Sequence, residues 1–256
     1  MQVERVEEPA RLAAAVELLA EIWATPPGCP PLPADVLRSL GHGGGAVHVA
    51  FRAGTPIGAA AAFFGPPAAR SVYSLIAGAH SSDRGIGVAL KQAQRVWALQ
   101  HDATVMLWTF DPLVSRNARF NLVKLGAMAR EYSVDFYGPL DDGLNSEDET
   151  DRLTAEWTLT DVRPQQPTDT PAPPDPATAD VTATAPDGGP LAIRVPDALW
   201  CRVPHDIVAL RQDDPGAAAG WRAAVRDVFV PAFAAGFRAT GMTRDGWYHL
   251  TTEEAG

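Results

Sequence analysis

The segment SSDRGIG at residues 81–87 constrains this chain more than any other feature, because it joins a strand pattern directly to a helix pattern. Residues 71–79 read as a strand, and VALKQAQRVWALQ at 88–100 reads as a helix with a recurring apolar side. The first amide groups of a helix have no internal partner and carry partial positive charge, so they form a ready site for phosphate. Gly85 and Gly87 let an anion approach the backbone, and Arg84 adds a direct charge. The segment therefore predicts a loop that binds a pyrophosphate.

Three classes of phosphate-binding glycine loop can be compared with this segment. A P-loop requires Gly-Lys-Ser/Thr, but Gly87 is followed by Val88. A Rossmann loop requires a third glycine at the position that Leu90 occupies. The remaining class is the acetyltransferase loop, Q/R-x-x-G-x-G/A, which fits with Gly85 and Gly87 in place and with Ser82 where Gln or Arg is usual. An ordinary strand-to-helix turn remains the alternative interpretation.

Hydrophobic periodicity predicts a regular succession of elements on both sides of this loop. Helices are expected at 9–23, 34–40 and 115–125, the last one ended by Gly126. Strands are expected at 47–51, 57–64, 71–79, 104–110, 132–137 and 155–159. Residues 104–110 form a continuous apolar run, which indicates a strand buried on both faces.

Composition divides the chain into three parts. No aromatic residue occurs from Thr158 to Leu199, where prolines recur, so this stretch cannot bury enough apolar surface to offset its ordering entropy. We expect a core domain at 1–160, a proline-rich linker or loose excursion at 161–190, and a C-terminal α/β extension at 191–256 that packs on the core. The extension is expected to hold a strand at 191–195, helices at 205–211 and 216–233, and two short strands ending at Tyr248.

Charge and cysteine content exclude several classes of function. The formal net charge of −10 argues against a nucleic-acid partner, which requires a basic face. No segment approaches 18 consecutive apolar residues, so we expect no membrane association and a cytoplasmic protein. Two cysteines are too few for a metal motif, and no metal is expected. The acidic residues between 141 and 151 lack the spacing of a calcium loop and are expected to be a solvated acidic loop.

The order of the expected elements over residues 1–140 resembles that of GNAT acyltransferases. SRNARFNLVKLGA at 115–127 is similar to the helix that follows the fifth strand of that fold. RGIGVALKQAQRVWAL, WTFDPLVSRNARFNLVKLGA, FYGPLDDGLN and DRLTAEW together resemble one GNAT branch, associated with N-acylamino-acid racemase and o-succinylbenzoate synthase pathways, which includes amino-acid succinyltransferases. WRAAVRDVF and AAGFR near the C-terminus look like the same branch. The resemblance implies an α/β (α+β) GNAT fold, with a mixed, mostly antiparallel sheet flanked by helices.

The resemblance also implies a site for an acyl-CoA co-substrate, either acetyl-CoA or succinyl-CoA. The acyl-CoA would lie between the strands at 71–79 and 104–110, which separate from each other. Backbone amides of the first strand would hold the pantetheine arm and polarise the thioester carbonyl, and the glycine loop would hold the pyrophosphate. The residues implied in CoA binding are Ala77, Gly78, Ala79, Ser82, Arg84, Gly85, Ile86, Gly87, Val88 and Asn117.

The sequence departs from the usual GNAT pattern in its acid and base residues. Many GNAT enzymes place a tyrosine, which protonates the departing thiolate, where this chain has Leu122. A thiol has a pKa near ~8.5, so the thiolate can leave tolerably without an acid. No carboxylate lies on the strand at 71–79, which leaves Tyr73, His80 and Asp111 as candidates for the general base. For His80, a surface position at the end of a strand is the alternative.

Two residues of the 115–125 helix are candidates for substrate binding. Arg116 could recognise a carboxylate through its planar guanidinium, and Asn121 would lie near the substrate. Solvated surface for Arg116 and helix-capping or loop contacts for Asn121 are the alternatives.

The sequence as a whole predicts an acyl-CoA-dependent N-acyltransferase. The acceptor is expected to be a primary amine of a small molecule, such as the α-amine of an amino acid, attacked directly without a covalent enzyme intermediate. A homodimer is compatible with the sequence. The alternative from a different functional class is a CoA-binding sensor or scaffold of GNAT fold without catalysis, which Leu122 and the missing strand carboxylate favour.

Overall fold

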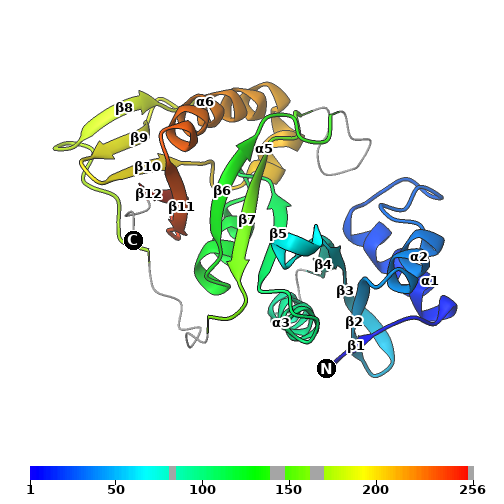
Figure 1. The fold of residues 1–256 in the computed structure, drawn as a ribbon. Helices are drawn as coiled ribbons and strands as arrows, with labels where there is room; N and C mark the ends of the chain where they lie inside the picture. The colour runs from blue at the N-terminus through cyan, green and yellow to red at the C-terminus, as the bar shows by residue number, and fades with distance from the viewer. Residues whose placement is uncertain (81–84, 139–147, 162–169, 253–256) are drawn as a thin grey trace. The chain divides into compact units, whose positions relative to one another are not determined.

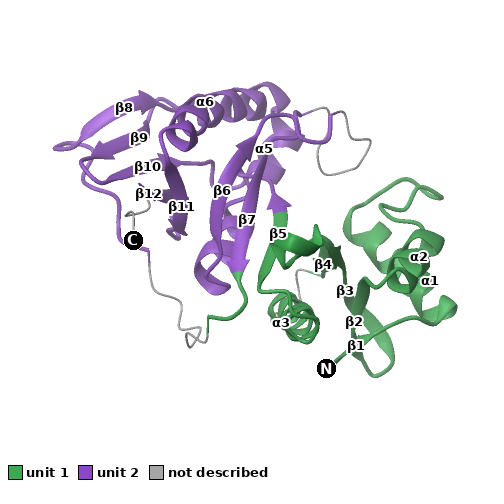
Figure 2. Ribbon diagram, in the orientation of Figure 1, with its two compact units in different colours: residues 1–108, 142–144, 158–162 green, residues 109–141, 145–157, 163–256 purple. Residues whose placement is uncertain are grey.

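A computed structural model of the chain describes residues 1–80, 85–138, 148–161 and 170–252 (Figure 1). The chain divides into two compact units (Figure 2). Unit 1 comprises residues 1–108, 142–144 and 158–162, and unit 2 comprises residues 109–141, 145–157 and 163–256. The division differs from the expected one, since it falls after Trp108 and not near residue 160. Its physical reason is that the C-terminal segment pairs with residues 128–133 to build one sheet.

Unit 1 is a sheet with helices on both faces, and its strands follow the order β1-β2-β3-β4-β5. The β1–β2, β2–β3 and β3–β4 pairs are antiparallel, and β4 and β5 are parallel. Its elements are β1 (Gln2–Arg5), α1 (Pro9–Ile22), α2 (Ala34–His42), β2 (Ala46–Arg52), β3 (Thr55–Phe64), the 3-10 turn η1 (Pro67–Ala69), β4 (Ser71–Ala79), α3 (Ile86–Leu99) and β5 (Val105–Phe110), whose last two residues fall in unit 2.

The helices of unit 1 cover opposite faces of its sheet (Figure 1). Ala59 and Ala61 of β3 belong to the apolar cluster formed with α1 and α2. Ala60 lies between them and belongs instead to the cluster formed with Ile86 and Leu90 of α3. This alternation follows from the period of two along a strand. The run of small residues in β3 therefore lets helices approach the sheet on both sides.

The strands of unit 2 follow the order β7-β6-β11-β12-β10-β9-β8. The strand pairs within it are antiparallel, so the expectation of a mixed, mostly antiparallel sheet is confirmed. Its elements are α4 (Ser115–Arg119), the π-helical turn η2 (Phe120–Lys124), β6 (Met128–Ser133), β7 (Arg152–Thr158), β8 (Asp180–Thr184), β9 (Pro190–Val195), β10 (Ala198–Arg202), α5 (Ile207–Asp213), α6 (Pro215–Ala234), β11 (Phe237–Met242) and β12 (Trp247–Thr252).

Three strands were not expected from periodicity, namely β1, β8 and β10. The strand β8 lies inside the expected linker, because Val181 and its neighbours gain backbone partners from β9 across a turn that contains Asp187 and Gly188. The strand β6 begins at Met128 and ends at Ser133, whereas a strand was expected at 132–137. The helix expected at 115–125 is an α-helix only to Arg119 and continues as a π turn. Gly126 follows it with φ of +70°, as expected of a residue that ends a helix.

Buried ion pairs connect segments of unit 2 that lie far apart in the sequence. Asp111 follows β5, and its carboxylate accepts hydrogen bonds from Arg211 of α5 at 2.5 Å and from Arg222 of α6 at 3.1 Å. The same two arginines bind Asp148 at 2.9 Å and 2.7 Å. Asp151 is buried and pairs with Arg226 of α6. The expectation of a solvated acidic loop is therefore wrong for Asp148 and Asp151. Arginines distant in the sequence neutralise both carboxylates.

Among the described residues, none of the helices is both long enough and apolar enough to cross a membrane.

Removal of Arg222 tests the importance of these ion pairs. Arg222 is 1% exposed, so its replacement in Arg222→Ala leaves Asp111 and Asp148 buried with one guanidinium group fewer. We expect the free energy of unfolding, measured with urea, to fall by about 3–5 kcal/mol. The matched control is Arg5→Ala, which removes the exposed pair with Glu7 and should change stability by at most ~1 kcal/mol. Equal effects of the two substitutions would contradict a structural role of the buried pairs.

Candidate active site

The pairing between β4 and β5 is short and leaves most of one edge of β4 without a partner strand. The two strands are paired only at Ser71–Tyr73 of β4, opposite Val105–Leu107 of β5. Within the described part of unit 1, β4 continues for six further residues without β5 beside it. Backbone N–H and C=O groups on that edge can therefore bind another extended molecule. The resemblance to GNAT acyltransferases implies such a separation between these two strands.

A β-bulge interrupts β4 at Leu75. Ala61 of β3 pairs with Ile76, and Ala62 pairs with Ser74, so Leu75 is an extra residue on β4. A bulge leaves its extra residue outside the ladder and re-aims the side chains around it. Ser74 contacts α3 on one face of the sheet, whereas Ile76 packs with the α1 and α2 cluster on the other. The bulge therefore places an irregular backbone segment beside the end of the β4–β5 pairing.

The N-terminus of α3 has the geometry that the glycine loop predicts. Gly85 precedes the helix with φ of +92°, a left-handed conformation that favours glycine. The first helical hydrogen bond runs from the amide of Ala89 to the carbonyl of Gly85. The amides of Ile86, Gly87 and Val88 come before it and have no partner within the helix. Ser82 and Arg84, the other predicted members of the loop, lie outside the described residues.

The last residues of β4 lie on the unpaired part of the strand. Ala77, Gly78 and Ala79 pair with β3 on one side, and their other edge has no partner strand in the described part of unit 1. A side chain on Gly78 would bring its Cβ to 2.4 Å from the Trp23 ring, so this glycine also permits the packing of α1 on β4. Glycine at position 78 thus has a structural reason besides the predicted contact with CoA.

The three candidate bases occupy different surroundings. The Tyr73 ring contacts that of Phe63, with ring centroids 5.5 Å apart. The next residue of β3, Phe64, contacts Trp97 of α3. Because successive side chains of a strand point to opposite faces, Phe63 and Tyr73 lie on the face opposite α3. His80 follows β4, with Nε2 3.8 Å from a carboxylate oxygen of Glu21. Both are partly exposed.

Asp111, the third candidate base, is already engaged in the buried ion pairs of unit 2. Burial raises the pKa of Asp111, but the guanidinium groups of Arg222 and Arg211 outweigh this effect and hold the pKa below its usual range. A carboxylate that is paired in this way is a poor proton acceptor. This environment argues against Asp111 as the base.

The predicted site residues of the 115–125 helix lie in unit 2. Arg116 and Asn117 are exposed on α4, whereas Asn121 is buried in the π turn η2. Leu122 is 3% exposed and therefore belongs to the core at the position where a proton-donating tyrosine is usual. A π turn is often found at functional sites, but here its centre is apolar.

One buried polar cluster of unit 1 was not predicted from the sequence. Lys91 of α3 is buried, and its Nζ donates a hydrogen bond of 2.9 Å to Oγ of Ser74. Ser74 in turn donates to Oε1 of Gln94 at 2.9 Å. The Lys91 Nζ also lies 3.8 Å from the centroid of the Trp108 ring. The available signal was that Lys91 falls next to Leu90 within the apolar pattern of this helix, in a chain with only two lysines.

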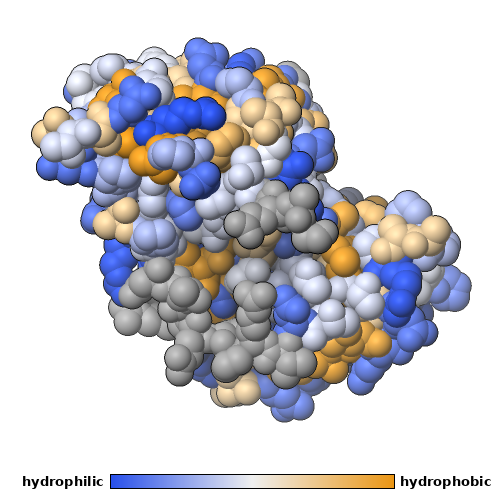
Figure 3. Space-filling model, turned by 60° about the vertical axis from the view of Figure 1, so that its left-hand side comes forward, coloured by the Kyte–Doolittle hydropathy of each residue, from blue (hydrophilic) through white to orange (hydrophobic). Residues whose placement is uncertain are grey.

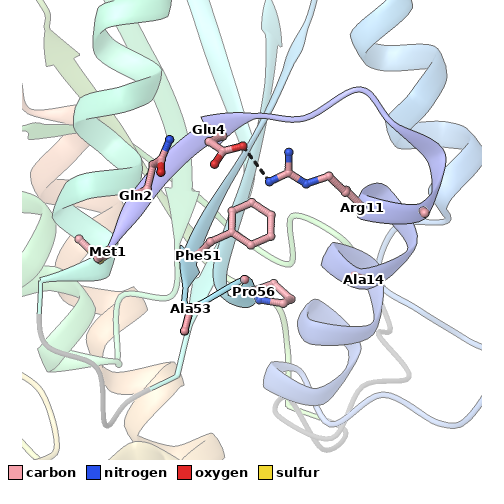
Figure 4. Close-up of a pocket in the computed structure, with 10 residues that line it drawn as sticks. Met1, Gln2, Glu4, Arg11, Ala14, Phe51, Ala53 and Pro56 are labelled. Atoms are coloured by element: carbon pink, nitrogen blue, oxygen red, sulfur yellow. Dashed lines mark hydrogen bonds and ion pairs between the residues drawn. The ribbon is translucent and has the colours of Figure 1, made fainter.

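Two surface hollows lie away from these residues. A hollow of about 630 Å³ is lined by β1, α1 and the β2–β3 turn (Figure 4). In it, Arg11 binds Glu4 at 2.8 Å and lies 4.3 Å from the centroid of the Phe51 ring. A second hollow, of about 490 Å³, is lined by residues of β8–β10 and α6. The space-filling view shows apolar surface residues interspersed with hydrophilic ones (Figure 3). Neither hollow is lined by a predicted site residue.

Comparison with solved structures identifies the fold. An N-acetyltransferase from Staphylococcus aureus Mu50 is 15% identical, with a TM-score of 0.50 over 62% of this chain and 98% of that chain. The ribosomal-protein-alanine N-acetyltransferase from Brucella melitensis is 15% identical, with a TM-score of 0.51 over 62% of this chain and 99% of that chain. An aminoglycoside 6'-acetyltransferase of type Ii is 13% identical, with a TM-score of 0.50 over 68% of this chain and all of that chain.

These similarities concern the fold, because the sequence identities are low. The chain has the fold of these N-acetyltransferases, and the predicted GNAT fold is confirmed. No protein-family model matches the chain, and no curated protein matches it. The resemblance to the branch with amino-acid succinyltransferases therefore stays a prediction.

The buried position of Leu122 leads to a prediction about catalysis. Leu122→Ala should lower the free energy of unfolding by roughly 2–5 kcal/mol, because it truncates a core side chain. At a temperature where the variant is folded, kcat of an acyl-transfer assay should stay close to that of the unchanged protein. Lys124→Ala, an exposed neighbour in the same turn, is the control for stability. A large loss of kcat with stability preserved would show that this position takes part in the reaction.

Proposed function

We propose that this chain is an acyl-CoA-dependent N-acyltransferase that transfers an acyl group to a primary amine. The observation that carries the proposal is in unit 1, where β4 has an edge without a partner strand and the first amides of α3 have no partner within the helix. A strand edge can hold the amide groups of a pantetheine arm, and a helix N-terminus can hold a pyrophosphate. The N-acetyltransferase fold supports the same assignment.

The residues of unit 1 have separate tasks in this proposal. The amides of Ile86, Gly87 and Val88 bind the pyrophosphate, and the predicted loop residues Ser82 and Arg84 add to this contact. The edge of β4 at 77–79 aligns the pantetheine arm. Backbone amides of β4 near the Leu75 bulge polarise the thioester carbonyl and stabilise the oxyanion that forms when the amine attacks.

The attacking amine must lose a proton, and two side chains are candidates for its removal. Tyr73 lies on the sheet face opposite α3, next to the end of the β4–β5 pairing. His80 follows the other end of β4, so it would need a water chain to reach the proton. Asp111 is not a candidate, because its carboxylate is paired with Arg211 and Arg222.

The acceptor and donor follow from the resemblance to one GNAT branch. The acceptor is the α-amine of an amino acid or of a related metabolite. The acyl group is succinyl or acetyl, with succinyl favoured by that resemblance. The same resemblance assigns Asn117 to the binding of the pantetheine arm and Asn121 to the binding of the substrate. A succinyl carboxylate requires a paired donor when it is buried, and the exposed Arg116 of α4 is the proposed one.

Substitution of Gly87 tests the binding of CoA. Gly87→Glu introduces bulk and negative charge among the free amides of α3, so we expect acyl-CoA binding measured by calorimetry to be abolished in a folded protein. Val96→Glu introduces the same charge at an exposed position of the same helix and should leave the affinity unchanged. Unchanged affinity of the Gly87→Glu variant would remove the central claim. Binding of acyl-CoA without release of free CoA for any amine would instead favour a sensor or scaffold.

Substitution of Arg116 tests the acyl donor. If Arg116 binds the succinyl carboxylate, Arg116→Ala should lower kcat/KM for succinyl-CoA while kcat/KM for acetyl-CoA changes little. The measured quantity is the ratio of the two values in the unchanged protein and in the variant. A ratio that favours acetyl-CoA in the unchanged protein, or one that the substitution does not alter, would contradict this role.

A further inference from the structure

The buried amine of Lys91 lies at the point where β4 and β5 separate. Ser74, which accepts its hydrogen bond, directly follows Tyr73, the last residue of β4 that pairs with β5. Trp108, whose ring lies beneath the amine, directly follows Leu107, the last paired residue of β5. The amine therefore touches both strands at the closed end of the gap between them. The helix α3, which carries Lys91, packs against β4 (Figure 1).

Lys91 has no acidic partner among the described residues. It is 4% exposed, and its amine contacts the Ser74 hydroxyl and the Trp108 ring. The elements that pack on α3 are β1 to β4, and none of their titratable side chains forms an ion pair with Lys91 in the described part of the chain. These side chains are Glu4, Arg5, His48, Arg52 and Tyr73. Burial without a counter-charge lowers the pKa of Lys91 to about 7.

The side-chain amide of Gln94 lies in the same polar cluster as Lys91. Gln94 is fully buried, and its Nε2 has no hydrogen-bond partner in the described structure. Buried polar groups are normally satisfied, so an orphaned amide beside an uncompensated amine points to a group that this structure does not contain.

The distance along β4 is suitable for a CoA thioester. Ala79, next to the pyrophosphate loop, and Ser74 are five residues apart, which is roughly 16 Å in a strand. An extended pantetheine arm has a comparable length. A molecule bound at the N-terminus of α3 and along β4 therefore brings its sulfur atom to the closed end of the gap.

We propose that Lys91 is the general acid that protonates the departing CoA thiolate, an assignment that rests on the proposed function. When the tetrahedral intermediate collapses, its C–S bond breaks and the electron pair stays on sulfur. The Lys91 ammonium then donates a proton to this sulfur, which gives the thiol of CoA and a neutral amine. Solvent reprotonates the amine before the next turnover. The transfer is downhill, because a thiol has a pKa near ~8.5.

The position of Lys91 favours this role over that of the base. Ser74 and Lys91 lie on the α3 face of the sheet, whereas Tyr73 lies on the opposite face. A proton donor to the leaving group and a base for the incoming amine are needed on opposite sides of the reacting carbon. Leu122 cannot donate a proton, so Lys91 supplies the missing acid from a different helix.

The experiment compares Lys91→Met with Lys124→Met, which removes the only other lysine, an exposed one. Lys91→Met should retain CoA affinity in calorimetry and keep or raise the thermal stability at pH 7, since it removes a buried charge. Its kcat should fall by about tenfold or more, as expected for loss of a general acid. The unchanged protein should lose activity above a pKa near 7, and this alkaline limb should be absent in Lys91→Met. Lys124→Met should change none of these quantities.

Ser74→Ala provides an independent test that does not depend on the folding of Lys91→Met. The Ser74 hydroxyl accepts from the ammonium and stabilises its charged form, so its removal should move the alkaline limb to lower pH. An alkaline limb at the same pH in Ser74→Ala, or an unchanged kcat and pH profile in Lys91→Met, would overturn the role of Lys91 alone. A chain that binds no CoA would overturn the proposed function and the role of Lys91 together.

Discussion

Three residue pairs between β4 and β5 are the constraint on which the candidate site depends. Parallel neighbours in a sheet require a crossover, and α3 is that crossover in unit 1. The crossover places the start of a helix beside the end of β4, so amides without a partner in the helix lie near a strand edge without a partner strand. Strands also twist, and the bulge at Leu75 adds to the local twist beyond the third pair. The candidate site is therefore mainly a property of backbone geometry and depends little on particular side chains.

The sequence predicted the elements around this site well, because their signals are local. The bounds of β4 match the predicted strand, and α3 begins within the predicted glycine loop, where Gly85 has the left-handed conformation. The expected solvated acidic loop was wrong for Asp148 and Asp151, because their partners lie 63 to 75 residues further along the chain. Lys91 was missed because a lysine in a helix usually extends its amine to solvent.

Charge has two different uses in the two units. In unit 2, Asp111 and Asp148 share the guanidinium groups of Arg211 and Arg222, so each buried charge is compensated. Such pairs add little net stability over apolar packing. An arrangement that leaves one of the buried charges unpaired is strongly disfavoured, so we infer that the pairs specify which segments of unit 2 pack together. In unit 1, Lys91 is the opposite case of a buried amine without a counter-charge among the described residues. A pKa lowered to about 7 suits a group that exchanges protons near neutral pH.

The place of the C-terminal hairpin in its sheet has a consequence for biosynthesis. The strands β11 and β12 are the last in the sequence, yet they lie between β6 and β10. Nearly all of unit 1 is the continuous run of residues 1–108, so it can form while the ribosome is still translating the rest. The sheet of unit 2 cannot close until residues 237–252 have emerged, and until then β6 and β10 each present an open edge. During that interval the nascent chain is exposed to pairing with other strands, so chaperone demand should be highest before residues 237–252 have emerged.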